Sequence, residues 1–131
     1  MVIKISPITP VKKELDQADP SGETYVMIKP ITYRDDMARG ELLKERETSN
    51  TGRASKGINM YFLRAEELWL TYADAHIVLE DEDGKQSEPF GPREEMTRDD
   101  FMKALIALQP AIVFEWHQKI VEVNPDWAFP F

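Results

Sequence analysis

The sequence predicts a mostly helical α+β fold in one domain, with an N-terminal β arm or hairpin, about four helices and a short β-hairpin. The chain has 131 residues, 42% hydrophobic and 31% charged, which is the balance of one globular domain. The segment 23–32 is rich in β-branched and aromatic residues, and later segments repeat apolar residues at three- and four-residue steps. We therefore divide 1–131 into a β region (1–32), a helical region (33–124) with a loop (48–57), and an aromatic tail (125–131).

Two strands are expected in the β region. Val2–Ile5 alternates apolar and polar residues and is followed by Pro7, which suits a short edge strand or arm. Glu23–Thr32 has the strongest strand composition in the chain. Between them lies the turn signal Pro20–Gly22, so pairing of the two strands as a hairpin is plausible on sequence grounds.

The first two helices are predicted on either side of a loop. Thr32 precedes two acidic residues, as at a helix N-terminus, and this helix should run from Tyr33 to about Glu47. Thr48–Gly57 has no apolar residue larger than alanine and is predicted to be a loop. Ile58–Ala75 is predicted to be the longest helix. Its apolar stripe, which we assign to the core, consists of Ile58, Tyr61, Phe62, Ala65, Leu68, Trp69, Tyr72 and Ala73.

The remaining elements are a short hairpin and two helices. His76–Leu79 is predicted to be a strand that ends in an acidic turn closed by Gly84, with a weak return strand after it. Thr97 resembles the N-cap of a third helix. Pro110 would open a fourth helix at its first turn, where a missing N–H costs little, and Asn124-Pro125 would end it.

The net charge of −8 is unevenly distributed, and it argues against nucleic-acid binding. Residues 1–66 contain 11 basic and 10 acidic side chains, whereas residues 67–131 contain 5 basic and 14 acidic ones. Clustered Lys and Arg supply the affinity for phosphate backbones, so an acidic half would repel nucleic acid. No apolar run approaches the ~20 residues of a membrane-spanning helix, so no membrane partner is expected. The acidity favours solubility, and it would orient a partner with basic segments.

No pattern of residues indicates a catalytic, cofactor or metal site. Cysteine is absent, and the glycines form no phosphate-binding motif. His76 and His117 lie far apart in sequence, and we expect structural roles for them: His76 at the end of the long helix and His117 at the edge of a buried face. A calcium-binding loop with Gly84 at its sixth position would place Leu79, which has no ligand oxygen, at its first position. We therefore predict that the protein is not an enzyme and keep a small hydrolase with dispersed Asp and His residues as a remote alternative.

With no sign of a reactive site, the remaining functional candidate is a surface that binds another protein, and the aromatic tail is its main feature. Three large rings lie within the last five residues, and leaving them in water would cost about 25 cal/mol per Å² of apolar area. Two interpretations stay open: the rings fold back onto the domain, or they dock on another chain. The candidate partner-binding residues lie off the main helical stripe or in the tail. They are Leu63, Leu70, Trp127, Phe129 and Phe131.

The order of the segments from Tyr25 to Trp127 is also informative. An apolar strand with Pro30-Ile31-Thr32 leads into an acidic helix start. It is followed by a helix containing Leu68-Trp69, by His76–Leu79 and its acidic turn, by Thr97–Phe101 and by paired helices that end at Pro125. This order resembles tail assembly chaperones of long-tailed bacteriophages and prophages.

The resemblance implies a small, mostly helical, non-enzymatic protein in the cytoplasm of the bacterial host. Members of that family bind the tape measure protein during tail assembly, keep it soluble and help to recruit major tail subunits. The tape measure protein is therefore the expected partner and the major tail protein a second one, and a homo-oligomer stays open. The proline-containing arm and the aromatic end at Trp127–Phe131 do not match the family. They keep open a structural tail or head-tail completion protein that is retained in the virion.

Overall fold

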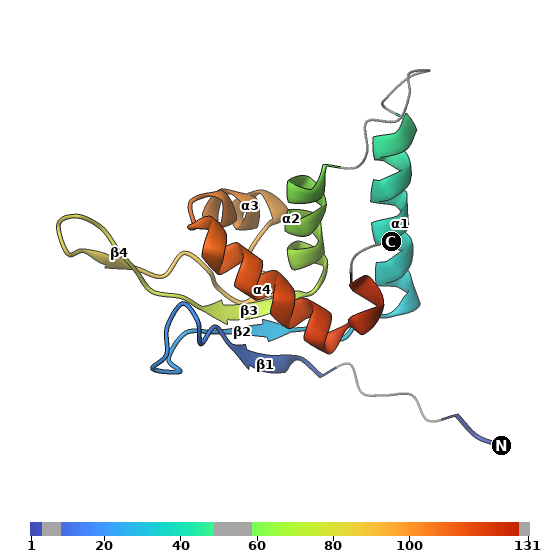
Figure 1. Cartoon of the computed structure of the whole chain (residues 1–131), viewed down its shortest axis with the longest axis horizontal. Coiled ribbons are helices and arrows are strands. Elements are labelled where there is room, and N and C mark those ends of the chain that lie inside the picture. The colour runs from blue at the N-terminus through green and yellow to red at the C-terminus, as the bar shows by residue number, and fades with distance from the viewer. Residues whose placement is uncertain (4–8, 49–58, 129–131) are drawn as a thin grey trace.

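The computed structural model describes residues 1–3, 9–48 and 59–128, and it confirms the α+β class. Within these residues the chain forms four α-helices, a three-stranded antiparallel sheet and a two-stranded hairpin (Figure 1). The elements are β1 (Val11–Glu14), β2 (Tyr25–Ile28), α1 (Tyr33–Thr48), α2 (Met60–Leu70), β3 (Tyr72–His76), β4 (Leu79–Glu80), β5 (Gln86–Ser87), α3 (Arg98–Ile106) and α4 (Pro110–Val123), with 3₁₀ turns η1 (Arg93–Glu95) and η2 (Pro125–Trp127).

The central sheet has the strand order β1-β2-β3. Strand β2 lies in the middle and confirms the strand expected within 23–32, with Val26 and Ile28 buried in the core. The hairpin expected in the β region is confirmed, but its first strand is not the predicted segment Val2–Ile5. Val2 and Ile3 are exposed and form no strand, and residues 4 and 5 lie outside the described part of the chain. The partner of β2 is β1, which begins after Pro10. The sequence of β1, Val-Lys-Lys-Glu, does not predict a strand, because an edge strand that is exposed to water needs no alternation of apolar residues.

The connection from β1 to β2 covers residues 15–24, turns at Gly22 and is hydrogen-bonded to α4. Gly22 has φ +81°, a conformation that glycine adopts without strain. The Asp19 carboxylate accepts hydrogen bonds from the Ser21 N–H (3.0 Å) and the Thr24 hydroxyl (2.7 Å). Hydrogen bonding from the side chain of Ser21, then from the side chain of Thr24 and the Ser21 backbone, holds the pKa of Asp19 below its ordinary value. The Glu115 carboxylate of α4 accepts from the backbone N–H groups of residues 17 and 18 at 2.8 and 3.0 Å. These bonds fix the sheet edge against the helical layer.

The long helix predicted over Ile58–Ala75 ends at Leu70, and this is the main error in the predicted fold. The Thr71 hydroxyl donates to the Glu67 carbonyl (2.9 Å), and the Lys29 N–H of the neighbouring chain segment donates to the Thr71 carbonyl (2.8 Å). The sheet therefore takes the hydrogen bond that a further helical turn would need. The next five residues form β3, which pairs with β2.

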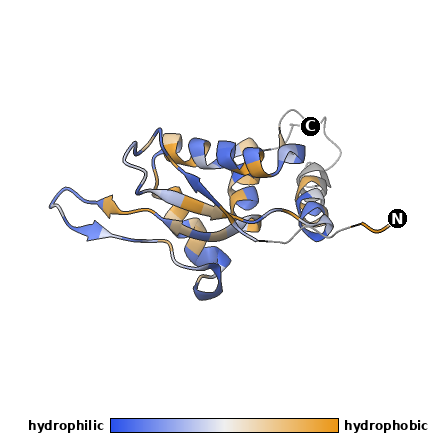
Figure 2. Ribbon diagram, turned by 90° about the horizontal axis from the view of Figure 1, so that it is seen from below, coloured by the Kyte–Doolittle hydropathy of each residue, from blue (hydrophilic) through white to orange (hydrophobic). Residues whose placement is uncertain are grey.

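A hairpin with its turn at Gly84 is confirmed, but the strand predicted over His76–Leu79 is wrong, because His76 ends β3 and β4 begins only at Leu79. β4 and β5 pair Leu79 with Ser87 and Glu80 with Gln86. The Asp81 carboxylate accepts from the N–H groups of residues 83 and 85, both at 2.9 Å, so it builds the turn. Gly84, with φ +79°, closes it. In Figure 2 the hairpin projects from the rest of the molecule and its tip is hydrophilic.

Helices α2, α3 and α4 pack beside the sheet, and α1 stands next to α2 (Figure 1). Helix α2 contacts all three other helices, and α4 contacts β2. Aromatic rings fill the space between these layers, with ring centroids 4.7–6.3 Å apart. They belong to Trp69, Tyr72, Phe90, Phe101 and Trp116. None of the helices in the described ranges combines the length and the apolar composition needed to cross a bilayer.

Three helix starts confirm the predictions made from local sequence. Asp35 of α1 accepts hydrogen bonds from the N–H (3.0 Å) and the hydroxyl (3.3 Å) of Thr32. Thr97 and Asp100 form a reciprocal capping box at α3. Pro110 is the first residue of α4, which ends at Val123 before the Asn124 cap. These three helix starts are fixed by neighbouring residues, and the sequence predicts them.

The buried hydroxyl of Tyr72 makes the stability of the fold depend on pH in the alkaline range. Tyr72 is 1% exposed and its hydroxyl donates to the Gly91 carbonyl. Burial, and then the charge of Asp74, raises the pKa of Tyr72 above its ordinary value of 10.0. The unfolded chain would lose this proton near its ordinary pKa while the folded chain keeps it, so the free energy of unfolding should fall as the pH rises above 10.

We expect Tyr72→Phe to reduce this alkaline loss of stability. The measurement is the urea unfolding midpoint between about pH 9 and pH 11, and Tyr61→Phe is the matched control because Tyr61 is 75% exposed. Near neutral pH Tyr72→Phe should cost only about 1 kcal/mol, for the lost hydrogen bond. Parallel pH profiles for the wild type and Tyr72→Phe would contradict the prediction.

Candidate partner-binding site

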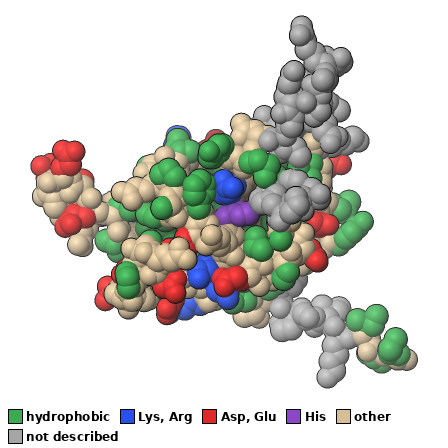
Figure 3. All heavy atoms as spheres, in the orientation of Figure 1, with side chains coloured by type: hydrophobic (Ala, Val, Ile, Leu, Met, Phe, Trp, Pro, Cys, Tyr) green, Lys and Arg blue, Asp and Glu red, His purple; other side chains and the backbone are tan. Residues whose placement is uncertain are grey.

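An open apolar groove lies where α2, the end of α3 and the start of α4 meet. Its volume is about 250 Å³. We call it the apolar groove, and its lining residues are Tyr61, Arg64, Ala65, Leu105, Ile106, Leu108, Pro110, Val113 and Phe114. Figure 3 shows hydrophobic side chains gathered over the part of the surface formed by these helices, whereas acidic side chains gather at the tip of the β4–β5 hairpin.

The spacing of residues on two helices builds the walls of the groove. On α2 the lining positions are 61, 64 and 65, and on α4 they are 110, 113 and 114. Both sets follow the i, i+3, i+4 pattern, which places side chains on one face of a helix. Only three residues separate α3 from α4, and within them the Leu108 N–H donates to the Leu105 carbonyl (3.0 Å). This short turn brings the end of α3 beside the start of α4.

The groove has a buried floor and an exposed rim. Leu105 and Leu108 are 3% and 8% exposed, so they are part of the core. The rim side chains Tyr61, Ile106 and Phe114 are 75%, 80% and 40% exposed. Large apolar side chains that face water around an apolar floor are typical of a surface that binds another protein. The arrangement can therefore receive apolar side chains from a partner.

One cation and no carboxylate line this groove. The Arg64 guanidinium lies 4.7 Å from the centre of the Phe114 ring and 5.9 Å from that of Tyr61. Among the described residues, no carboxylate lies within ion-pair distance of Arg64. Stacking on the two rings holds the guanidinium at the rim. The groove is thus apolar with a single positive charge, on a chain whose net charge is −8.

The structure does not place the predicted partner-binding residues on this surface. Leu63 is 2% exposed and Trp127 is fully buried, so the prediction that these two residues contact a partner at the surface is wrong. Leu63 is covered because α2 contacts helices on several sides, and Trp127 because the η2 turn folds it back onto the domain. Leu70 is half-buried and packs against the core. Phe129 and Phe131 lie outside the described residues.

The rim residues themselves were missed or misassigned. Tyr61 was assigned to the buried stripe of the long helix, but it is exposed. Ile106 and Phe114 carried no functional prediction. Which side of each helix stays uncovered depends on packing between helices, and no sequence motif reports it.

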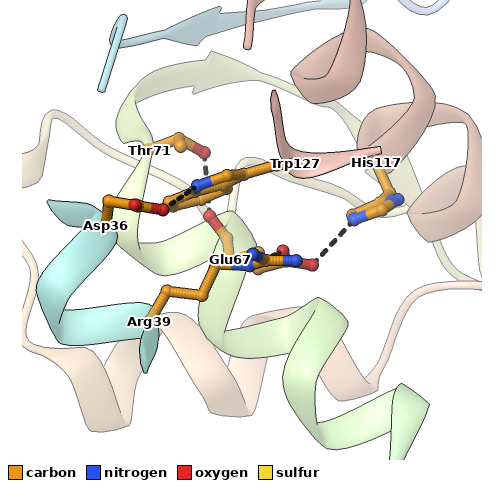
Figure 4. A network of polar contacts seen from close by, with 6 residues as sticks. All are labelled: Asp36, Arg39, Glu67, Thr71, His117 and Trp127. Carbon is orange, nitrogen blue, oxygen red and sulfur yellow. Dashed lines mark hydrogen bonds and ion pairs between the residues drawn. The ribbon is translucent and has the colours of Figure 1, made fainter. Parts of the chain in front are cut away.

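A cluster of polar side chains is buried between three helices (Figure 4). Glu67 of α2 is the centre of this buried polar cluster: its Oε2 lies 2.6 Å from Arg39 Nε of α1, and its Oε1 lies 2.9 Å from His117 Nε2 of α4. Trp127 lies beside them, with its ring centre 5.2 Å from the Arg39 guanidinium and its indole N–H donating to Asp36 (3.0 Å). Glu67 is 0% exposed and His117 is 6% exposed. Both oxygens of Glu67 are engaged, so the cluster ties α1, α2 and α4 together.

The second histidine occupies a different place from the one expected. His76 ends β3, whereas the sequence suggested the end of a long helix. Its ring stacks on Tyr25 at 5.5 Å, its Nδ1 lies 2.9 Å from the Glu23 carbonyl, and its Nε2 lies 3.2 Å from Glu88. In the ranges that the structure describes, no group of three or more His, Asp or Glu side chains is arranged to hold a metal ion.

Comparisons of the chain with family models, with curated proteins and with solved structures found no match.

Proposed function

We propose that this protein is a tail assembly chaperone of a phage or prophage, which binds and solubilises the tape measure protein in the cytoplasm of the bacterial host. The observation that carries the proposal is the apolar groove, whose exposed rim and buried floor suit one face of an amphipathic client helix. The resemblance over Tyr25–Trp127 supplies the identity of the client. The major tail protein is the second partner in this proposal.

The physical requirements of such a chaperone agree with the described surface. A long helical client exposes apolar faces before assembly, and covering them needs apolar surface on a soluble protein. Here the groove supplies that surface, and a net charge of −8 supplies the solubility. The acidic hairpin would attract basic segments of the client from a distance and raise the rate of encounter.

We expect co-expression of the wild type to raise the soluble fraction of the tape measure protein from the same genome. The variant Tyr61→Ala/Ile106→Ser should bind the client about tenfold more weakly, because it removes two exposed apolar side chains of the rim. Its own thermal midpoint should stay within a few degrees of the wild type, since exposed positions contribute little to folding. Pull-down and size-exclusion chromatography of the co-expressed pair measure the complex.

The matched control is Tyr33→Ala/Val78→Ser. Tyr33 and Val78 are 80% and 43% exposed, and neither lines the groove. The control should solubilise the client as the wild type does. Equal loss in both variants, or no effect of the wild type, would contradict the proposal. Mass spectrometry of purified virions adds a separate test, because a chaperone should be absent from the mature tail and a structural component present.

A further inference from the structure

We propose that the apolar groove selects an amphipathic helix that carries a carboxylate beside its apolar anchors, and that Arg64 binds this carboxylate. The inference rests on the use of the groove in the proposed function, and it names the chemistry of the segment that the groove receives. It follows from the charge of the groove, which is opposite in sign to that of the chain as a whole.

The size and shape of the groove favour a peptide segment over a small molecule. Pockets for drug-sized ligands have volumes of ~300–1,000 Å³. This groove is smaller, at about 250 Å³, and its walls are three helical segments with a rim of exposed large side chains. Grooves of this kind receive the i, i+3, i+4 anchors of a helix. A helix can fill the floor with apolar side chains and place its flanking residues at the rim.

Arg64 makes the rim selective for a negative charge. Its guanidinium stacks on Phe114 and lies near Tyr61, so its planar fork is already held in place before a partner binds. Arginine held in this way binds a carboxylate through two parallel hydrogen bonds. With no acidic residue in the lining and no carboxylate of the described chain within ion-pair distance, the site is open to a carboxylate from the partner.

The start of α4 has the same electrostatic sign. Pro110, its first residue, lines the groove, and the first turn of α4 contains no acidic residue. The N-cap, Gln109, makes no side-chain capping bond. The positive end of the helix dipole is therefore not neutralised by a side chain of the helix itself, and it reinforces Arg64.

The acidic second half of the chain limits which positions of the partner helix can carry a negative charge. Residues 67–131 carry a net charge of −9, so a helix that is acidic along its whole length would be repelled. A carboxylate at the groove and neutral or basic residues elsewhere satisfy both parts of the surface. The charge pattern thus discriminates among amphipathic helices that have the same apolar face.

The test uses three fluorescent helical peptides that share one leucine stripe and differ only at the two positions flanking it, which are Glu, Gln or Lys. We expect the wild-type protein to bind the Glu peptide about fivefold more tightly than the Gln peptide, as for one partly exposed ion pair, and the Lys peptide more weakly still. Arg64→Met should lose most of the preference for the Glu peptide and keep only the small part that the start of α4 supplies, and Arg64→Glu should prefer the Lys peptide. Fluorescence anisotropy titrations measure these affinities, and thermal midpoints confirm that each variant is folded.

Lys103→Met is the matched control, because it removes the same charge from the neighbouring α3 and Lys103 does not line the groove. It should keep the preference for Glu. Equal affinities of the wild type for all three peptides, a preference for Glu that is undiminished in Arg64→Met, or no binding at all would overturn the inference. Co-expression with the tape measure protein separates this failure from that of the proposed function. If the protein solubilises the tape measure protein but shows no preference among the peptides, the proposed function is supported and the inference is wrong. If it prefers the Glu peptide but does not solubilise the tape measure protein, the inference is supported and the proposed function is wrong.

Discussion

Replacement of Trp127 by alanine is expected to lower the free energy of unfolding by about 3–5 kcal/mol. The indole is fully buried, its ring centre lies 5.2 Å from the Arg39 guanidinium, and its N–H donates to Asp36 at 3.0 Å. Truncation to alanine removes the packing of the whole ring, the cation–π contact and the hydrogen bond. Urea denaturation followed by circular dichroism gives the free energy, with the slope of the transition as a check on two-state behaviour.

Trp127→Phe is the graded control, because it keeps part of the aromatic packing. It retains one six-membered ring and removes the five-membered ring with its N–H donor, so it should cost less than Trp127→Ala, about 1–3 kcal/mol. The two variants also test the two interpretations of the aromatic end of the chain. If Trp127→Ala lowered stability by less than about 1 kcal/mol and weakened client binding, the ring would serve the partner and the packing described above would be contradicted.

Sequence patterns predict the helices well where the determinants are local. Asp35 at the start of α1, the Thr97–Asp100 box of α3 and Pro110 of α4 each act within one helical turn. The turn of the β4–β5 hairpin is equally local, because Asp81 and Gly84 build it from within. Such features form wherever their own few residues come together, so no knowledge of the rest of the fold is needed.

Elements that depend on distant partners were predicted poorly. Tyr72 continues the apolar spacing of α2, but in the structure it is the first residue of β3. A helix and a strand would each place this side chain in the core, so its burial does not distinguish between them. The choice is made by the Lys29 N–H, which bonds the Thr71 carbonyl from 42 positions away. Strand β1 likewise exists through its pairing with β2 and has no strand pattern of its own.

The candidate site depends even more on tertiary packing. Tyr61 and Leu63 belong to the same helix, but one is 75% exposed and the other 2% exposed. An apolar stripe indicates that a helix has a buried side, and it does not indicate how many neighbours cover that helix. Because α2 contacts three other helices, its buried surface extends beyond the predicted stripe, whereas Tyr61 of that stripe is exposed and contributes to the rim of the groove.

Replacement of Glu67 by alanine is expected to lower the free energy of unfolding by about 3–5 kcal/mol. Its carboxylate lies 2.6 Å from Arg39 Nε and 2.9 Å from His117 Nε2, with the Arg39 and Glu67 side chains 9% and 0% exposed. Removing the carboxylate takes a buried partner from both groups at once, which is why the loss exceeds that of an exposed ion pair. Glu67→Gln keeps the shape and one hydrogen-bond acceptor, and should cost less, about 1–3 kcal/mol.

A double-mutant cycle with Arg39→Met and Glu67→Leu measures the Arg39–Glu67 interaction directly. We expect the double variant to be more stable than the sum of the two single losses predicts, because both single changes remove the same buried ion pair between α1 and α2 and the sum counts its loss twice. Hydrogen exchange of α1 should accelerate in Glu67→Ala more than that of α3, since Arg39 anchors α1 to this cluster and α3 has its own pair, Arg98 with Glu66. Additivity within about 0.5 kcal/mol, together with unchanged exchange in α1, would mean that apolar packing alone holds the helix in place.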